Sequence, residues 1–212
     1  MIDFVFNNRY MSCLFFCIIG YLCGSVMFAY WIPKWIKHID TIQETDDGNP
    51  GATNAFKNAG IHCGMLCLLL DMAKGAFPVY LSRYFVEESW IGFSLIMICP
   101  LIGHAFPMYQ KFHHGGKCIA TSFGVLIGLF PDLKLGFSLA IWYILFSTLI
   151  IIQPHALRTI VAYGGFIITS FFFTTNWFIL IGCACMAIIV VCRHLKSLKE
   201  SEERKIQWVF RQ

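Results

Sequence analysis

Two glycine-rich stretches of this sequence combine a flexible backbone with side chains that can hold an anion. The first reads Gly48-Asn49-Pro50-Gly51-Ala52-Thr53-Asn54 and comes just before a predicted helix. Glycines let backbone N–H groups approach an anion closely, and a helix N-terminus adds a favourable dipole. Asn and Thr side chains can supply further donors. The stretch is therefore a candidate phosphate-binding loop, although a plain turn between two helices has the same composition.

The second stretch adds a fixed positive charge. Gly115-Gly116-Lys117 opens an apolar helix that carries Thr121 in its first turn. The pattern is not a Walker A motif, because the first glycine and the spacing are missing. The neighbouring His113 and His114 are adjacent, so they point in different directions, and no carboxylate lies near them. We therefore expect interfacial histidines there rather than a metal site.

Charged residues also occur inside or at the ends of apolar segments. Asp71 and Lys74 are three residues apart, so they share one helix face. Ionisable residues in a membrane segment are rare and functional by default, and the alternative is a structural ion pair buried against neighbouring helices. Arg193-His194 follows the last apolar segment. This pair fits a positive anchor at the membrane surface, or a lid on a polar pocket.

The elements that position these residues are membrane helices. Of the 212 residues, 58% are hydrophobic and 13% are charged, against roughly a quarter charged in soluble domains. The apolar run 11–31 is too long for a signal peptide and lacks a small-residue cleavage site, so we expect it to be the first membrane helix. The net charge of +4 is modest and gives no indication of nucleic-acid binding.

The hydropathy pattern predicts an all-α, polytopic membrane protein with about seven transmembrane helices in a single domain over residues 1–212. The apolar segments are approximately 11–33, 61–82, 90–107, 119–131, 135–152, 157–173 and 177–192. Two, 119–131 and 177–192, are shorter than the roughly 17 residues at the lower limit for a spanning helix. Segment 119–131 is the one we expect to span only in part.

The distribution of positive charge predicts the orientation. Twelve of the sixteen lysines and arginines fall on one side of the predicted spans, three fall on the other, and Lys74 lies within a span. The positive-inside rule then places the N-terminus outside and the C-terminus in the cytoplasm. Both glycine-rich stretches and Arg193-His194 face the cytoplasm in this arrangement. We therefore expect one shared site at the cytoplasmic interface.

Taken together, the motifs resemble the acyl-phosphate:glycerol-3-phosphate acyltransferases of bacteria, the PlsY family. The resemblance covers nearly the whole chain, in order and at the right separations. Its motifs are Gly24-Ser25, the stretch 48–54, Asp71-x-x-Lys74-Gly75, Gly103-His104-x-Phe106-Pro107, Gly115-Gly116-Lys117 with Ala120-Thr121, and Arg193-His194.

The resemblance implies a seven-helix enzyme of the bacterial cytoplasmic membrane without metal or cofactor. Such an enzyme moves a fatty acyl group from acyl phosphate to the sn-1 hydroxyl of glycerol 3-phosphate, which gives lysophosphatidic acid for phospholipid synthesis. Its partners are these two substrates, membrane lipid and an enzyme that produces acyl phosphate. Because acyl phosphate is already activated, alignment and charge stabilisation are the main tasks of the protein. The acceptor's own phosphate, with a second pKa near ~6, can take the hydroxyl proton.

The resemblance also implies roles for individual residues. The expected catalytic residues are Lys57, Lys117 and His194, together with Asp47, which departs from the family and would set acceptor identity with Ser197. The expected substrate-binding residues are Gly48, Asn49, Gly51, Thr53, Asn54, Gly115, Gly116, Thr121, Arg193 and Ser197. Asp71, Lys74 and His104 are expected to support the site, with Asp71 and Lys74 beneath the first loop. Lys117 and its glycines would hold acyl phosphate, while Lys57 and Arg193 would face the acceptor and His194 would position it.

Several departures from the family pattern fall where the acceptor is expected. The family reads Gly-Ser-Gly-Asn where this chain reads Asp46-Asp47-Gly48-Asn49, and Lys57 replaces an arginine. Gln43 and Glu44 replace basic residues, Ser197 replaces an asparagine, and Glu200 replaces an arginine. The site has thus lost donors and gained carboxylates, and two like charges a few ångströms apart cost on the order of several kcal/mol.

These departures leave two alternatives to ordinary glycerol-3-phosphate acylation. One is a divergent paralogue that acylates a neutral or amine acceptor, with Asp47 contacting the amine or acting as a base. The other is a membrane protein that binds lipid phosphate without turnover. Retention of Lys117, Asn54, Asp71 and Lys74 argues against the second alternative.

Overall fold

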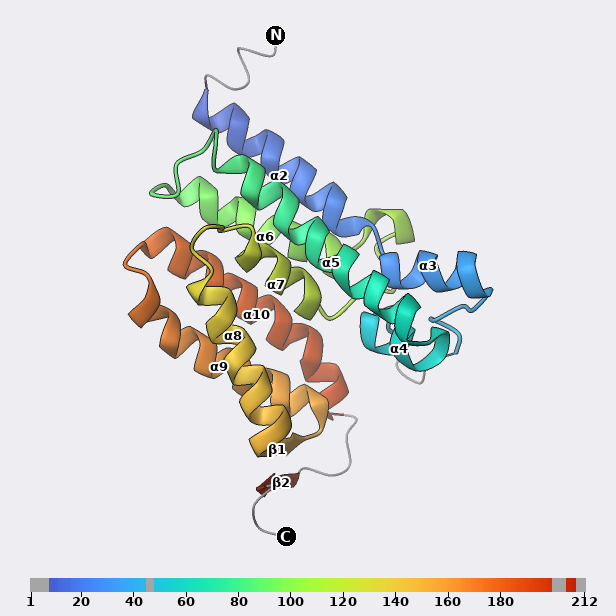
Figure 1. Cartoon of the computed structure of the whole chain (residues 1–212). Coiled ribbons are helices and arrows are strands. Elements are labelled where there is room, and N and C mark those ends of the chain that lie inside the picture. Colours follow the sequence, from blue (N-terminus) through green and yellow to red (C-terminus); the bar gives the residue numbers. More distant parts are fainter. Residues whose placement is uncertain (1–7, 45–47, 200–204, 209–212) are drawn as a thin grey trace.

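The protein is a bundle of helices, seen here in a computed structural model that describes residues 8–44, 48–199 and 205–208 (Figure 1). The helices are α2 Arg9–Ser25, α3 Phe28–Lys37, α4 Ala52–Ala59, α5 Ile61–Ser82, α6 Ile91–Ala105, α7 Ile119–Ile127, α8 Lys134–Ile144, α9 His155–Phe173 and α10 Trp177–Lys199. A 3-10 turn η1 (Met108–Gln110), a π-helical turn η2 (Leu145–Leu149) and the strands β1 (Ile150–Gln153) and β2 (Lys205–Trp208) complete the described part.

Five of the seven expected spans have helices of spanning length and composition in the part of the chain that the structure describes. They are Arg9–Lys37, Ile61–Ser82, Ile91–Gln110, His155–Phe173 and Trp177–Leu195, and Lys134–Leu149 is a shorter apolar helix. α7 has nine residues, about 14 Å of helix against a hydrocarbon core of about 30 Å. Seven full spans are therefore not confirmed. The start of α2 and the end of α10 lie at opposite ends of the bundle (Figure 1), and the inside–outside orientation stays a prediction.

The first expected span, 11–33, is two helices rather than one. α2 ends at Ser25, Val26 and Met27 have non-helical backbone angles, and α3 begins at Phe28. α3 leaves α2 at a clear angle (Figure 1). The break is stabilised from outside the segment, because Lys74 Nζ of α5 donates to the carbonyl oxygen of Val26 at 2.5 Å. A cation at a helix C-terminus is favourable to the helix dipole.

A two-stranded ribbon corrects the all-α prediction. β1 pairs with β2 in antiparallel register, with Ile150 opposite Trp208 and Gln153 opposite Lys205. The expected helical segment 135–152 therefore ends early, and its last residues are a strand. A run of β-branched isoleucines at 150–152 has high strand propensity, and hydropathy alone does not distinguish such a run from a helix.

Small residues let α2 and α6 approach closely. A Cβ atom on Gly24 would lie 2.1 Å from the carbonyl oxygen of Pro100, and one on Gly103 would lie 2.1 Å from that of Tyr21. Such contacts between small residues are the usual way in which membrane helices pack. This crossing fixes the C-terminal end of α6, where His104 lies, against the end of α2.

Candidate active site

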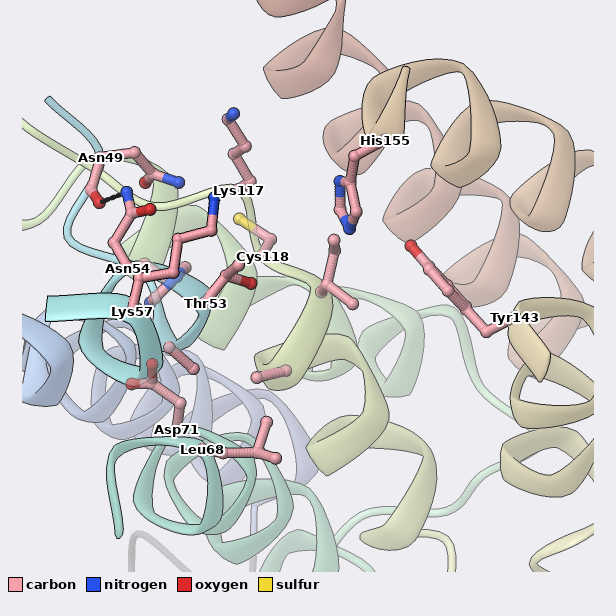
Figure 2. A pocket seen from close by; sticks show the side chains of 15 residues that line it. Asn49, Thr53, Asn54, Lys57, Leu68, Asp71, Lys117, Cys118, Tyr143 and His155 are labelled. Atoms are coloured by element: carbon pink, nitrogen blue, oxygen red, sulfur yellow. Dashed lines mark hydrogen bonds between the residues drawn. The ribbon is translucent and has the colours of Figure 1, made fainter. Parts of the chain in front are cut away.

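Eight of the seventeen predicted site residues line one cavity of about 400 Å³ (Figure 2). It is lined by Asn49, Gly51, Ala52, Thr53, Asn54, Lys57, Leu68, Asp71, His104, Lys117, Cys118, Ile119, Ala120, Tyr143 and His155. Eight of these were predicted: Asn49, Gly51, Thr53, Asn54, Lys57, Lys117, Asp71 and His104. Both glycine-rich stretches therefore contribute to the same cavity, as expected.

Three helices begin at this cavity. The lining includes Gly51 and Ala52 at the start of α4, Cys118 and Ile119 at the start of α7, and His155, the first residue of α9. The first N–H groups of a helix have no partner within it, and the helix dipole places partial positive charge there. The side chains of Lys57 and Lys117 add two cations to the same lining. The cavity is suited to an anion with several oxygens.

The first glycine-rich stretch is held in shape by its own side chain. Asn54 Nδ2 donates to the carbonyl oxygen of Asn49 at 2.8 Å, and this hydrogen bond is drawn in Figure 2. The backbone N–H of Gly51 donates to the same oxygen at 2.8 Å. Gly48 has a φ of 55°, in the left-handed region that favours glycine, and does not line the cavity. The loop therefore presents the first turn of α4 to the cavity in a shape set by two hydrogen bonds to the Asn49 carbonyl oxygen.

The second glycine-rich stretch packs against the end of α6. The backbone N–H of Gly116 donates to the carbonyl oxygen of His104 at 2.9 Å. A Cβ atom on Gly116 would lie 2.0 Å from His104 Nε2, and one on Gly115 would lie 1.8 Å from the carbonyl oxygen of Ala105. Neither glycine lines the cavity. Of the anion-binding groups expected here, Lys117 and the first turn of α7 therefore line the cavity, and the two glycines do not.

Arg193 contacts this stretch rather than the cavity. Its Nη2 donates to the carbonyl oxygen of Gly115 at 2.6 Å and its Nε to that of Gly116 at 3.1 Å. The guanidinium carbon also lies 5.6 Å from the ring centroid of Phe106. Both of these Arg193 hydrogen bonds go to backbone carbonyl oxygens, so the expected contact of Arg193 with the acceptor stays a prediction.

Asp71, Lys74 and His104 form a buried cluster beneath the cavity. Lys74 Nζ lies 2.7 Å from Asp71 Oδ1 and 2.8 Å from His104 Nδ1, and the two charged side chains are 3% and 2% exposed. The predicted pairing of Asp71 with Lys74 is confirmed. The hydrogen bonds of Lys74 reach Val26 after α2 and His104 of α6, and the His104 carbonyl oxygen accepts from Gly116, so this support reaches the second glycine-rich stretch. Support of the first stretch stays a prediction.

Other predicted residues lie away from the cavity lining. His194 is fully buried, its Nδ1 lies 2.7 Å from the carbonyl oxygen of Val190, and its ring centroid is 6.1 Å from that of His155. It therefore lies behind His155. Thr121 is fully buried, and Ser197 is half-buried in α10. Asp47 and Glu200 lie outside the residues that the structure describes.

Sequence reasoning missed the wall formed by Tyr143 and His155. Figure 2 shows both across the cavity from Asn49 and Asn54. His155 follows Gln153-Pro154 at the start of an apolar segment, and a histidine at that position was a usable signal. Tyr143 lies within an apolar segment, where an aromatic residue usually faces lipid or the core. Only the three-dimensional arrangement distinguishes it.

Comparison with known proteins identifies relatives over most of the chain. The family model described as glycerol-3-phosphate acyltransferase matches residues 14–202. The glycerol-3-phosphate acyltransferase of Thermotoga petrophila is 34% identical over 90% of this chain and 95% of its own length. That of Listeria welshimeri is 32% identical over 91% and 96%. Glycerol-3-phosphate acyltransferase 2 of Thermotoga maritima is 43% identical, over 61% of this chain, and the match spans 64% of that relative.

Two solved structures share the fold. Both are crystal structures of PlsY (YgiH), an integral membrane glycerol 3-phosphate acyltransferase. The glycerol 3-phosphate form is 27% identical with a TM-score of 0.78, over 92% of this chain and 96% of that chain. The lysophosphatidic acid form is 26% identical with a TM-score of 0.77, over 89% and 91%.

Proposed function

This chain belongs to the glycerol-3-phosphate acyltransferase family of integral membrane proteins, and from that premise we propose that it acylates the sn-1 hydroxyl of glycerol 3-phosphate with acyl phosphate as donor. The product is lysophosphatidic acid, the entry to phospholipid synthesis. We place the reaction in a bacterial cytoplasmic membrane, with the cavity open to the cytoplasm as the charge distribution predicts.

One observation carries this proposal: three helix N-termini and two lysines surround a single cavity. Both proposed substrates are phosphate esters or anhydrides, and oxygens of a phosphate are good acceptors for backbone N–H groups and ammonium groups. The two lysines come from different parts of the chain: Lys57 lies in α4, and Lys117 immediately precedes the N-cap residue of α7. This arrangement offers one cation to each of two phosphates.

The residues divide the work accordingly. Lys117 and the first turn of α7 hold acyl phosphate, and Lys57 with the first turn of α4 holds glycerol 3-phosphate. The acceptor hydroxyl oxygen attacks the carbonyl carbon, the bond from that carbon to the phosphate oxygen breaks, and phosphate leaves. The hydroxyl proton passes to the acceptor's own phosphate, whose second pKa is near ~6. The cationic and N–H groups stabilise the developing negative charge.

Acyl transfer by purified protein in lipid tests the proposal. Palmitoyl phosphate and labelled glycerol 3-phosphate are the substrates, and labelled lysophosphatidic acid is the readout. Lys117→Ala should lower kcat/KM by about 10²-fold or more, because it removes a cation from the transferring group. Lys111→Ala is the matched control, since Lys111 is an exposed lysine of the same loop outside the cavity lining. Equal rates for the two variants, or no transfer by the wild type, would contradict the proposal.

A changed acceptor is the second candidate, and the position of Arg193 favours it. Arg193 donates to the carbonyl oxygens of Gly115 and Gly116 and does not line the cavity. Among the described residues, the lysines and arginines that line the cavity are therefore Lys57 and Lys117. The sequence also carries Asp47 where the family has serine. If the wild type is silent and Asp47→Ser gains activity with glycerol 3-phosphate, then amines and neutral polyols are the acceptors to screen. Silence of every variant with every acceptor indicates a lipid-phosphate-binding protein without turnover.

A further inference from the structure

We propose that His104 donates a hydrogen bond from its Nε2–H to an anionic oxygen of the substrate in the cavity. The inference rests on the proposed function and gives a direct role in it to a residue that the sequence marks only as support. It follows from the number of N–H donors on the neighbouring Lys74 and from the position of the His104 ring.

The ammonium of Lys74 has three hydrogens and three acceptors around it. A lysine ammonium carries three N–H donors and no acceptor. Its three partners are Asp71 Oδ1 at 2.7 Å, the carbonyl oxygen of Val26 at 2.5 Å and His104 Nδ1 at 2.8 Å. The first two are oxygens without a proton to give. The contact with His104 is therefore a bond in which the lysine donates and Nδ1 accepts.

This bond selects one tautomer of His104. A neutral imidazole that accepts at Nδ1 carries its proton on Nε2. The ammonium at 2.8 Å also disfavours a second positive charge on the ring, because like charges at this separation repel strongly in a buried site. The ring is thus a neutral donor with its N–H on the Nε2 side.

His104 lines the cavity, and Nε2 is the ring nitrogen that Lys74 leaves available for a substrate. His104 is 4% exposed and contributes to the cavity lining. Its Nε2 makes no hydrogen bond to any residue in 8–44, 48–199 or 205–208. Gly116 leaves the space for this edge of the ring, since a Cβ atom there would lie 2.0 Å from Nε2. An N–H that remains available at this edge of the ring can donate to an oxygen of a bound phosphate or acyl carbonyl.

Two substitutions at His104 separate the two sides of the ring. An asparagine side chain ends near the position of Nδ1, so His104→Asn can still accept from Lys74 but has no donor at Nε2. A glutamine reaches the position of Nε2, so His104→Gln restores that donor. We expect His104→Asn to lower kcat/KM by about 10²-fold and His104→Gln to retain activity within about tenfold. A purely supporting role predicts the reverse order, with His104→Asn close to the wild type.

Binding of inorganic phosphate separates this inference from the proposed function. A ligand that binds the folded state raises the unfolding midpoint, and the shift can be measured for each variant in detergent. A shift that is lost in His104→Asn and kept in His104→Gln supports the donor even if the wild type transfers no acyl group. If His104→Asn loses kcat but keeps the phosphate-induced shift of the unfolding midpoint, the Nε2–H donor is supported and its acceptor is the acyl carbonyl oxygen. Wild-type rates and shifts in His104→Asn, or no shift and no transfer in the wild type, would overturn the inference.

Discussion

Arg193 Nη2 donates to the carbonyl oxygen of Gly115 at 2.6 Å, across a separation of 78 residues. The last long helix thereby holds the loop that leads into α7 and positions Lys117 at the cavity. The guanidinium makes a second bond to Gly116, so its planar fork is used in a way that an ammonium cannot reproduce.

Arg193→Lys should therefore loosen this loop. It removes at least one charge-assisted hydrogen bond, each of which contributes roughly 1.5–3 kcal/mol. For a chain of this size we expect the unfolding midpoint to fall by about 4 °C or more, with a lower rate of acyl transfer. Thermal unfolding in detergent measures the first effect. Lys199→Ala, an exposed basic residue of the same helix, is the control, and an unchanged midpoint and rate in Arg193→Lys would refute the assignment.

Lys57→Ala should act on acceptor binding. The side chain lines the cavity from α4, and we expect KM for glycerol 3-phosphate to rise about 10- to 100-fold with a smaller change in kcat, because the acceptor phosphate is bound in both ground state and transition state. Lys57→Arg should keep a low KM. Initial rates at varied acceptor concentration measure the split, and Lys37→Ala, exposed at the end of α3, is the control. An effect confined to the KM of acyl phosphate would reverse the assignment of the two lysines.

Gly103→Ala should destabilise the bundle at the crossing of α2 and α6. The new methyl group would lie 2.1 Å from the carbonyl oxygen of Tyr21, so the helices must move apart. Overpacking of this kind costs about 1–3 kcal/mol. Gly164→Ala is the matched control, because nothing lies within 4 Å of a Cβ atom there and alanine is a better helix former than glycine by up to about 1 kcal/mol. Equal unfolding midpoints for the two variants would contradict this account of the crossing.

The thiol of Cys118 should be unreactive at neutral pH. Burial raises the pKa of Cys118 from 9.0 to about 12, and the thiolate is the nucleophile in alkylation. The folded state thus favours the protonated thiol, and this contribution to stability is complete below pH 9 and is lost as the pH rises toward 12. Mass spectrometry after N-ethylmaleimide treatment at pH 8 should find the exposed Cys192 modified and Cys118 modified only after denaturation. Equally fast labelling of both cysteines would show that the Cys118 site is open.

Local patterns in the sequence predicted much of the bundle and part of the site. Hydropathy located the five long apolar helices, and the spacing of Asp71 and Lys74 predicted their ion pair. Glycine-rich stretches before helices predicted that Asn54 and Lys117 would share a cavity. Each of these signals depends on residues within one or two helical turns, so the sequence alone contains them.

The features that escaped prediction depend on partners far along the chain. The break at Val26 needs Lys74, which lies 48 residues away, and β1 ends a predicted helix because it pairs with β2. The target of Arg193 lies 77 and 78 residues upstream. Tyr143 and His155 join the site only through the packing of α8 against α9. No local pattern records such contacts.

The shortness of α7 has a consequence for how reactants can meet. A helix of about 14 Å fills less than half of the hydrocarbon thickness, and the cavity occupies the bundle at its N-terminal end. We therefore expect the recess to lie at the boundary between the aqueous and hydrocarbon phases. Under the proposed function, the donor can then keep its acyl tail among lipid chains while its phosphate reaches the recess, and the water-soluble acceptor can reach the same point from the aqueous side. The acyl tail then stays in the hydrocarbon phase and the acceptor stays in water.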